Sequence, residues 1–98
     1  ILPLTTRNNL ISVDKVSTGT LSASLAHPRE VFIPAIKNSA SSVIIAHNHP
    51  SGDTQPSEDD LEITKRLTEA GKILGIEVID HIIVTKYGYF SFKDKGLI

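Results

Sequence analysis

Two histidines one residue apart, followed closely by acidic residues, are the part of this sequence best suited to chemistry. They stand in the stretch IIAHNHPSGDTQPSEDD, residues 44–60. Successive side chains of a β-strand point to opposite faces, so His47 and His49 share a face if a strand continues through Asn48. Pro50 favours this arrangement, because the residue before a proline is pushed towards extended geometry. Two imidazoles on one face can converge on a single metal ion.

Asp60 is the third candidate ligand. It lies one helical turn before Ile63 and two turns before Leu67, so it falls on or beside the apolar stripe of a helix whose other charges face outward. A buried carboxylate needs a partner, because burying it unpaired costs several kcal/mol. Zinc would supply that partner, and with no cysteine in the chain any metal must be held by histidines and carboxylates. Two histidines and one carboxylate leave the fourth tetrahedral position open to water, which is typical of catalytic zinc. The metal lowers the pKa of that water to about 7.

Two further residues are candidates for assisting such a metal. Glu30 stands in the first turn of an expected upstream helix and can act as an acid and base. Ser57, one turn before Asp60, can donate a hydrogen bond to a developing oxyanion. Each residue also has a structural interpretation. A glutamate near a helix N-terminus complements the helix dipole, and Ser57-x-x-Asp60 resembles a capping box. The sequence leaves these alternatives open, and the capping box is compatible with a metal role.

The elements that must position these residues are a strand before the loop and a helix after it. Residues 42–47 predict a short buried strand, apolar on both faces. Ser57 is expected to cap a helix that runs to about Leu74 and ends at Gly75. Upstream, PREVFIPAIK predicts a helix that is kinked or broken near Pro34. The apolar positions of this helix form two i,i+4 pairs, Val31 with Ala35 and Phe32 with Ile36.

The remaining runs complete a mixed sheet. Leu2–Thr5 and Leu10–Val16 favour an opening hairpin, IEVIDHIIVT predicts a strand, and YGYFSF predicts another after a tight turn at 86–88. The order hairpin, helix, strand, helix, strand, strand predicts an α/β domain with helices packed on the sheet. Asp80 and His81 place polar groups on opposite faces of an apolar strand. Either of them could hydrogen-bond to a metal ligand without binding the metal itself. Alternatively, each is a polar residue of the core or edge whose hydrogen bonds are satisfied there.

His27 and residues 51–53 are interpreted without a role in metal binding. His27 precedes a proline in a turn and is interpreted as a surface residue. Residues 51–53 are interpreted as a turn. A phosphate-binding loop is not supported, because the glycines are too few and too far apart.

Length and composition limit the function classes. The 98 residues are expected to form one domain, residues 1–98, and the absence of an initial methionine suggests the C-terminal piece of a longer protein. Ten basic against 11 acidic residues, without a basic cluster among aromatics, argue against direct nucleic-acid binding. The longest apolar run, Val43–Ala46, is far too short to cross a membrane, and no signal peptide is evident. We therefore expect a cytoplasmic protein without membrane contact.

Taken together, these residues resemble a known family. The pattern His47-Asn48-His49-Pro50, six residues, then Ser57-Glu58-Asp59-Asp60, with Glu30 upstream in HPREVF, is similar to the JAMM motif of MPN/JAB-domain metalloproteases. The wider run HNHPSGDTQPSEDDLEITKRL, with GIEVIDHIIV and YFSF, resembles the RadC branch, whose bacterial members are traditionally labelled DNA repair proteins. The resemblance covers the chain from about Leu10 to the end.

The resemblance implies a fold and a set of roles. The fold would be a three-layer α/β/α sandwich with a mixed sheet, related in architecture to cytidine deaminases. His47, His49 and Asp60 would hold zinc, Glu30 would act as acid and base, and Ser57 would support the tetrahedral intermediate. Relatives outside the RadC branch cleave peptide or isopeptide bonds. Deaminase chemistry is not expected, because its zinc site requires cysteines.

Two functions from different classes remain open at this stage. The first is a zinc metallopeptidase or isopeptidase in which zinc-activated water attacks an amide carbonyl of a peptide or isopeptide substrate. The second is an accessory domain of DNA repair or recombination that binds protein partners and does not use its zinc catalytically. A metal-free relic of the fold is a weaker third alternative. The sequence also leaves open whether the domain forms a homodimer.

Overall fold

The computed structural model describes residues 1–4, 28–49 and 51–98. Within them the elements are β1 (Leu2–Leu4), α1 (Pro28–Lys37), β2 (Ser42–Asn48), α2 (Glu58–Leu74), β3 (Glu77–Thr85) and β4 (Gly88–Ser91). The expected hairpin strand Leu10–Val16 and the surface residue His27 lie outside the described residues, so the structure does not test either prediction.

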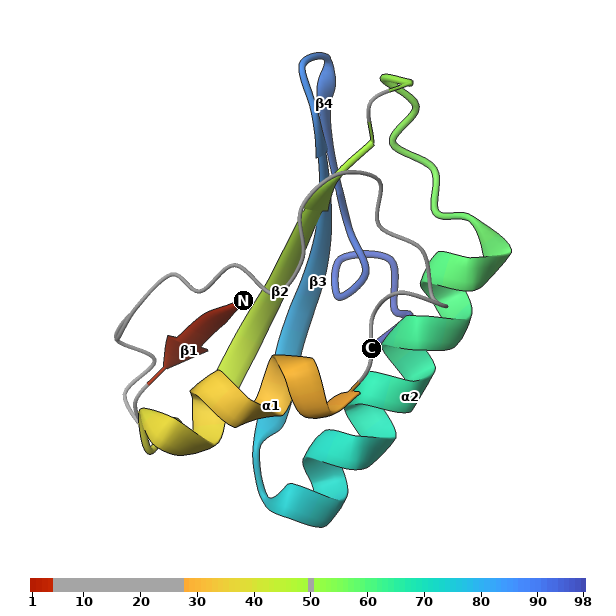
Figure 1. Cartoon of the computed structure of the whole chain (residues 1–98). Coiled ribbons are helices and arrows are strands. Elements are labelled where there is room, and N and C mark those ends of the chain that lie inside the picture. The colour runs from red at the N-terminus through yellow and green to blue at the C-terminus, as the bar shows by residue number, and fades with distance from the viewer. Residues whose placement is uncertain (5–27, 50) are drawn as a thin grey trace.

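The strands form a mixed sheet in the order β1-β2-β3-β4. The central pair, β2 and β3, is parallel, and both outer pairs are antiparallel. Figure 1 shows α1 lying across the lower part of the sheet and α2 running alongside it. The parallel pair follows from α2, which provides the crossover that two parallel strands require. The α/β class and the mixed sheet are therefore confirmed.

Both described helices pack against the same face of the sheet. Their buried side chains join those of β2 and β3 in one core made of Val31, Phe32, Ala35, Ala40, Val43, Ile45, Ile63, Leu67, Ile76 and Val78. The opposite face of β2 is more open, with Ile44 half-buried and Ala46 exposed. The exposure of Ala46 shows that the prediction of a strand buried on both faces is wrong. The described residues contribute two layers of the expected sandwich, and a third would have to come from outside them.

A register shift in the parallel pair decides which residues of β3 face this core. Val43 pairs with Val78, but the next residue, Ile44, pairs with Asp80. The extra residue on β3 is a β-bulge, which re-aims the side chains that follow it. As a result His81 lies opposite Ile45, on the helix-covered side of the sheet.

The predicted ends of α2 are confirmed. Ser57 is the N-cap, and Gly75 ends the helix in the left-handed conformation, with φ 73°. Glycine adopts this conformation without steric cost, and the amide of Ile76 then bonds to the carbonyl of Gly71 at 2.8 Å. All the charged residues of α2 predicted to face outward are exposed: Glu58, Asp59, Glu62, Lys65, Arg66, Glu69 and Lys72.

Helix α1 runs without a break through Pro34, so of the two predicted alternatives, a kink or a break, the break is wrong. Pro34 has no amide hydrogen and cannot make the intrahelical hydrogen bond to the carbonyl four residues earlier. The burial of Val31, Phe32 and Ala35 against the sheet and α2 holds the helix together. Ile36 does not share this core, because its side chain is exposed.

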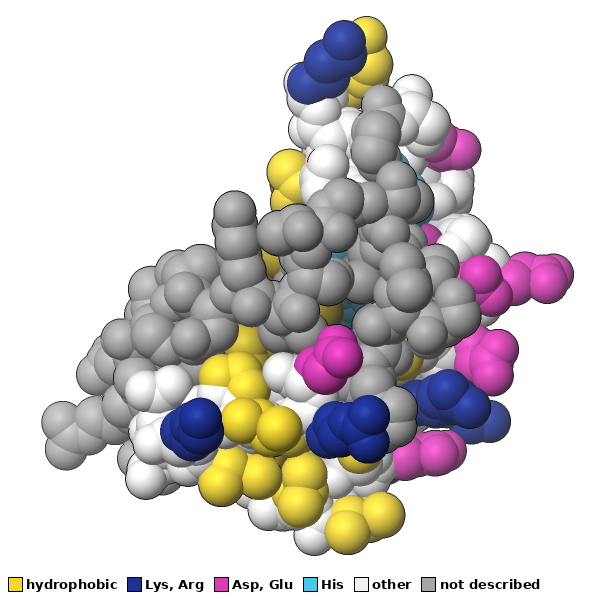
Figure 2. Space-filling model, in the orientation of Figure 1, with side chains coloured by type: hydrophobic (Ala, Val, Ile, Leu, Met, Phe, Trp, Pro, Cys, Tyr) yellow, Lys and Arg dark blue, Asp and Glu magenta, His cyan; other side chains and the backbone are white. Residues whose placement is uncertain are grey.

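Exposed apolar side chains gather between the two helices. Ile33, Ile36, Ile73 and Leu74 are all exposed and line a groove of about 390 Å³ whose floor includes Phe32. Figure 2 shows this part of the surface as a continuous hydrophobic area flanked by basic side chains.

Candidate metal centre

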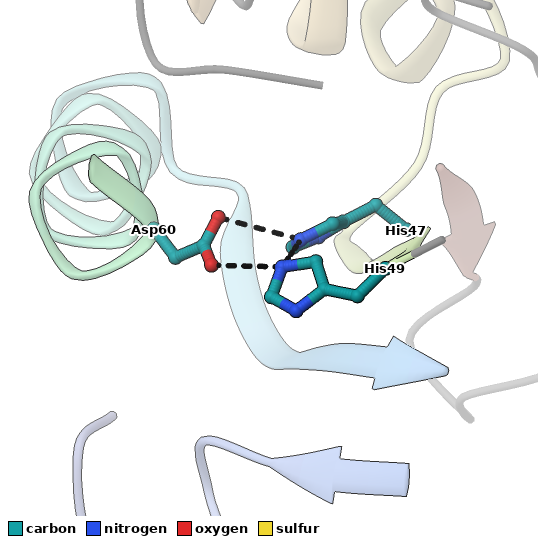
Figure 3. A group of neighbouring side chains, drawn as sticks. All are labelled: His47, His49 and Asp60. Carbon is teal, nitrogen blue, oxygen red and sulfur yellow. Dashed lines mark hydrogen bonds and ion pairs between the residues drawn. The ribbon is translucent and has the colours of Figure 1, made fainter. Parts of the chain in front are cut away.

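The three predicted ligands converge at the end of β2. The strand continues through Asn48, and the amide of His49 still bonds to the carbonyl of Val84 on β3, at 3.2 Å. The two histidines therefore share a face, as predicted, although the contribution of Pro50 lies outside the described residues. In Figure 3, Asp60 projects from the first turn of α2 towards both imidazoles.

The distances between the ligand atoms suit a small tetrahedral ion. Nε2 of His47 lies 3.1 Å from Nε2 of His49 and 3.3 Å from Oδ1 of Asp60. Nε2 of His49 lies 3.0 Å from Oδ2 of Asp60. Ligands placed about 2.0–2.1 Å from a tetrahedral zinc are about 3.3 Å from one another. Two imidazole nitrogens and a carboxylate in this arrangement therefore fit zinc in both donor type and spacing.

Asp60 performs two tasks at once. Its Oδ2 accepts a hydrogen bond from the backbone amide of Ser57 at 2.8 Å, while its own amide donates to Oγ of Ser57 at 3.0 Å. The capping box and the cluster of three potential metal ligands are thus both present, as the sequence allowed. The cap fixes the direction of the carboxylate, which leaves Oδ1 facing Nε2 of His47.

The ionised form of Asp60 is favoured although the residue is only 4% exposed. Burial by itself raises the pKa of this carboxyl group. Hydrogen bonds from the backbone and side chain of Ser57, together with the two histidines, outweigh burial and hold the pKa below its usual value. Asp60 is therefore a carboxylate at neutral pH, which is the form that binds a cation.

His49 is oriented by the loop that follows it. Its Nδ1 lies 2.9 Å from the carbonyl oxygen of Asp53. A carbonyl oxygen only accepts hydrogen bonds, so Nδ1 must carry the proton. A neutral His49 then has a bare Nε2 directed at His47 and Asp60, which is the tautomer needed for coordination.

His47 is backed by a residue that sequence reasoning left undecided. Burial lowers the pKa of His47, with Asp60 opposing and His49 reinforcing this shift. Its Nδ1 lies 2.7 Å from Nε2 of His81, which is only 1% exposed. Asp80 points elsewhere and accepts hydrogen bonds from Ser91 and from the backbone of β3 and the segment after β4. Of the two polar residues, His81 thus contacts the candidate ligand His47, and Asp80 is a polar residue whose hydrogen bonds are satisfied within the domain.

The two assisting candidates differ in position. Ser57 adjoins Asp60 and forms the cap described above. Glu30 is exposed in the first turn of α1 and does not belong to the converging group, which consists of His47, His49 and Asp60 within the described residues.

Removing the Ser57 hydroxyl should weaken the end of α2 that carries Asp60. We expect Ser57→Ala to lower the free energy of unfolding by about 1 kcal/mol, since an N-cap hydrogen bond is lost. Ser57→Thr should stay close to the wild type because it keeps the acceptor oxygen. Urea unfolding of the metal-free chains measures both, and an alanine variant as stable as the wild type would show that the cap contributes nothing.

Comparison with known proteins places this arrangement in a family. The model for the RadC-like JAB domain matches residues 1–97. The chain belongs to the RadC-like JAB domain family. A UPF0758 protein of Alkaliphilus oremlandii is 57% identical over 98 residues, covering 100% of this chain and 42% of the relative. UPF0758 proteins of Symbiobacterium thermophilum and Rubrobacter xylanophilus are each 56% identical over 98 residues, covering all of this chain and 42% and 43% of those relatives.

This JAB domain accordingly spans about two fifths of the length of these relatives. The names of these relatives state no activity. Among the described residues of the domain, neither helix is both long and apolar enough to cross a membrane.

Proposed function

We propose that this JAB domain is a zinc-dependent hydrolase of amide bonds in peptides or isopeptides. The observation that carries the proposal is the convergence of His47, His49 and Asp60 with ligand atoms 3.0–3.3 Å apart. Three side chains that each offer a lone pair repel one another when no cation lies between them. A divalent ion removes this repulsion and neutralises the buried carboxylate.

The donor set favours a catalytic role over a structural one. Structural zinc is almost always held by four protein ligands, whereas catalytic zinc has three and keeps one position open. Within the described residues this cluster supplies three. Zinc at this site would lower the pKa of a water molecule to about 7 and polarise a substrate carbonyl.

The proton transfers are assigned to Glu30. Its carboxylate would accept the proton that the attacking water loses and deliver it to the nitrogen that leaves, so that one proton moves and the C–N bond is replaced by a C–O bond. This role rests on the resemblance to the JAMM motif and on the exposure of Glu30 in α1. Ser57, beside Asp60, would donate a hydrogen bond to the oxyanion.

A groove next to His49 supports substrate binding at this end of the sheet. It has a volume of about 400 Å³, and its lining residues are Asn48, His49, Gly52, Val84, Thr85 and Lys86. A segment of polypeptide lying in this groove would pass directly beside the cluster.

A substrate screen tests the proposal. The zinc-loaded chain and the same chain stripped by a chelator are each incubated with a broad library of peptides and isopeptide-linked conjugates. We expect cleavage only by the loaded chain, restored when zinc is added back. A chain that binds one zinc ion and cleaves no member of the library would contradict a peptidase or isopeptidase function.

A further inference from the structure

His81 lies behind the proposed zinc site without offering a ligand to it. Besides contacting His47, it stacks on Phe92, with ring centroids 4.6 Å apart and an interplanar angle of 11°, and its Nδ1 lies 2.5 Å from Oγ1 of Thr64 on α2. Thr64 is itself only 2% exposed. These contacts join β2, β3 and α2 directly beneath the cluster.

The direction of each hydrogen bond in this group follows from one fixed acceptor. Oγ1 of Thr64 donates to the backbone carbonyl of Asp60 at 2.7 Å. A hydroxyl group has a single hydrogen, so towards His81 the oxygen of Thr64 can only accept. Nδ1 of His81 must therefore carry a proton and donate it to Thr64.

The position of the proton on His81 in turn fixes the position of the proton on His47. His81 is only 1% exposed, and its two ring nitrogens contact His47 and Thr64 rather than a carboxylate, so burial favours the neutral ring, which has one N–H. With that hydrogen on Nδ1, Nε2 of His81 is an acceptor, and Nδ1 of His47 donates to it across 2.7 Å. A neutral His47 with its proton on Nδ1 has a bare Nε2 facing His49 and Asp60.

We propose that Thr64 and His81 form a hydrogen-bond relay that fixes the tautomer and orientation of His47 and thereby sets the zinc affinity of the site. This inference rests on the proposed zinc site. The relay starts at the carbonyl of Asp60 and ends at the imidazole that faces the Asp60 side chain. The helix that supplies one ligand therefore also determines the protonation of another. His49 is oriented independently, through the carbonyl of Asp53 in the exposed loop.

Thr64→Val tests the relay with little change in shape. Without the hydroxyl, His81 has no acceptor at Nδ1 and can move its proton to Nε2. It would then donate to Nδ1 of His47 and leave the proton of His47 on Nε2, where it blocks coordination. Losing a residue that hydrogen-bonds to a metal ligand typically weakens metal binding about 10–100-fold. We expect the zinc affinity of the 98-residue chain to fall by a factor in this range, as measured by competition with a chelator.

Two matched variants separate the relay from a general effect on α2. Oγ1 of Thr68 donates to the carbonyl of Thr64 at 2.8 Å, the same type of bond one turn further along the helix. Thr68→Val should leave zinc affinity unchanged, and Thr64→Ser, which keeps the hydroxyl, should retain wild-type affinity. A folded Thr64→Val chain with wild-type zinc affinity would overturn the relay.

Nitrogen-15 NMR of the metal-free wild-type chain tests the relay apart from zinc. We expect His47 and His81 each to carry a proton on Nδ1, and the Thr64→Val chain to show the proton of His47 on Nε2. A wild-type His47 protonated on Nε2 would refute the relay even if zinc binds and peptides are cleaved. Conversely, the expected tautomers in a chain that binds no zinc would refute the proposed function and leave the relay standing as a structural feature.

Discussion

Replacing Asp60 by asparagine is expected to reduce zinc affinity by more than about 100-fold. The change removes the one charged ligand of the cluster, and its effect should exceed the 10–100-fold loss typical of residues that only support a ligand. The helix end should persist, because the side-chain oxygen of asparagine can still accept the hydrogen bond that Ser57 donates to Oδ2. Zinc affinity is measured by competition with a chelator of known strength.

Asp59→Asn is the matched control for this experiment. Asp59 is the preceding residue in the same first turn, carries the same charge and is exposed. It should retain wild-type zinc affinity, because its side chain lies outside the cluster. Equal losses in the two variants would mean that Asp60 attracts zinc only through general negative charge at this end of α2.

Replacing Glu30 by glutamine should leave zinc bound and lower the rate of amide hydrolysis by about 10²–10⁴-fold, the usual contribution of a general acid and base. Glutamine keeps the size and polarity of the side chain but neither accepts nor delivers a proton at neutral pH. The rate is measured on the best substrate from the library screen, and bound zinc is determined on the same samples.

Glu69→Gln provides the control for Glu30, since Glu69 is an exposed glutamate on the outer face of α2. It should hydrolyse the substrate at the wild-type rate. The structural alternative for Glu30 is that it only complements the dipole of α1, which would cost about 0.3–1 kcal/mol of stability and no activity. A Glu30→Gln chain that is slightly less stable and fully active would establish that alternative.

Helix α2 could be predicted almost to the residue because its signals are local. Ser57 and Asp60 form a reciprocal cap, Gly75 accepts the left-handed conformation, and Ile63 and Leu67 repeat at helical spacing. Each of these depends on residues within one or two turns. The inward position of Asp60 followed from the same spacing, and the three predicted ligands lie together as expected.

Features that depend on tertiary contacts could not be derived in this way. Whether α1 continues through Pro34 depends on how well Val31, Phe32 and Ala35 pack, and the sequence alone does not measure that packing. The exposure of Ile36 likewise depends on tertiary packing, which the sequence alone does not measure. A continuous apolar run in β2 suggested burial on both faces, but among the described residues the helices cover only one of them.

The role of His81 depends on a bulge that no local pattern predicts. Without the shift after Val78, strict alternation would place Asp80 opposite Ile45 and turn His81 to the other face of the sheet. The sequence signal was the pair of polar residues in an apolar strand, and it indicated that one of them had a partner. Only the register of β2 against β3 shows that the partner is His47.

The most direct test of the account is X-ray absorption at the zinc edge of the loaded chain. We predict one zinc ion per chain with two imidazole nitrogens at about 2.0–2.1 Å and oxygen completing the coordination, from Asp60 and solvent. A chain that takes up no zinc, or zinc whose coordination contains no imidazole, would contradict a metal centre built from His47, His49 and Asp60.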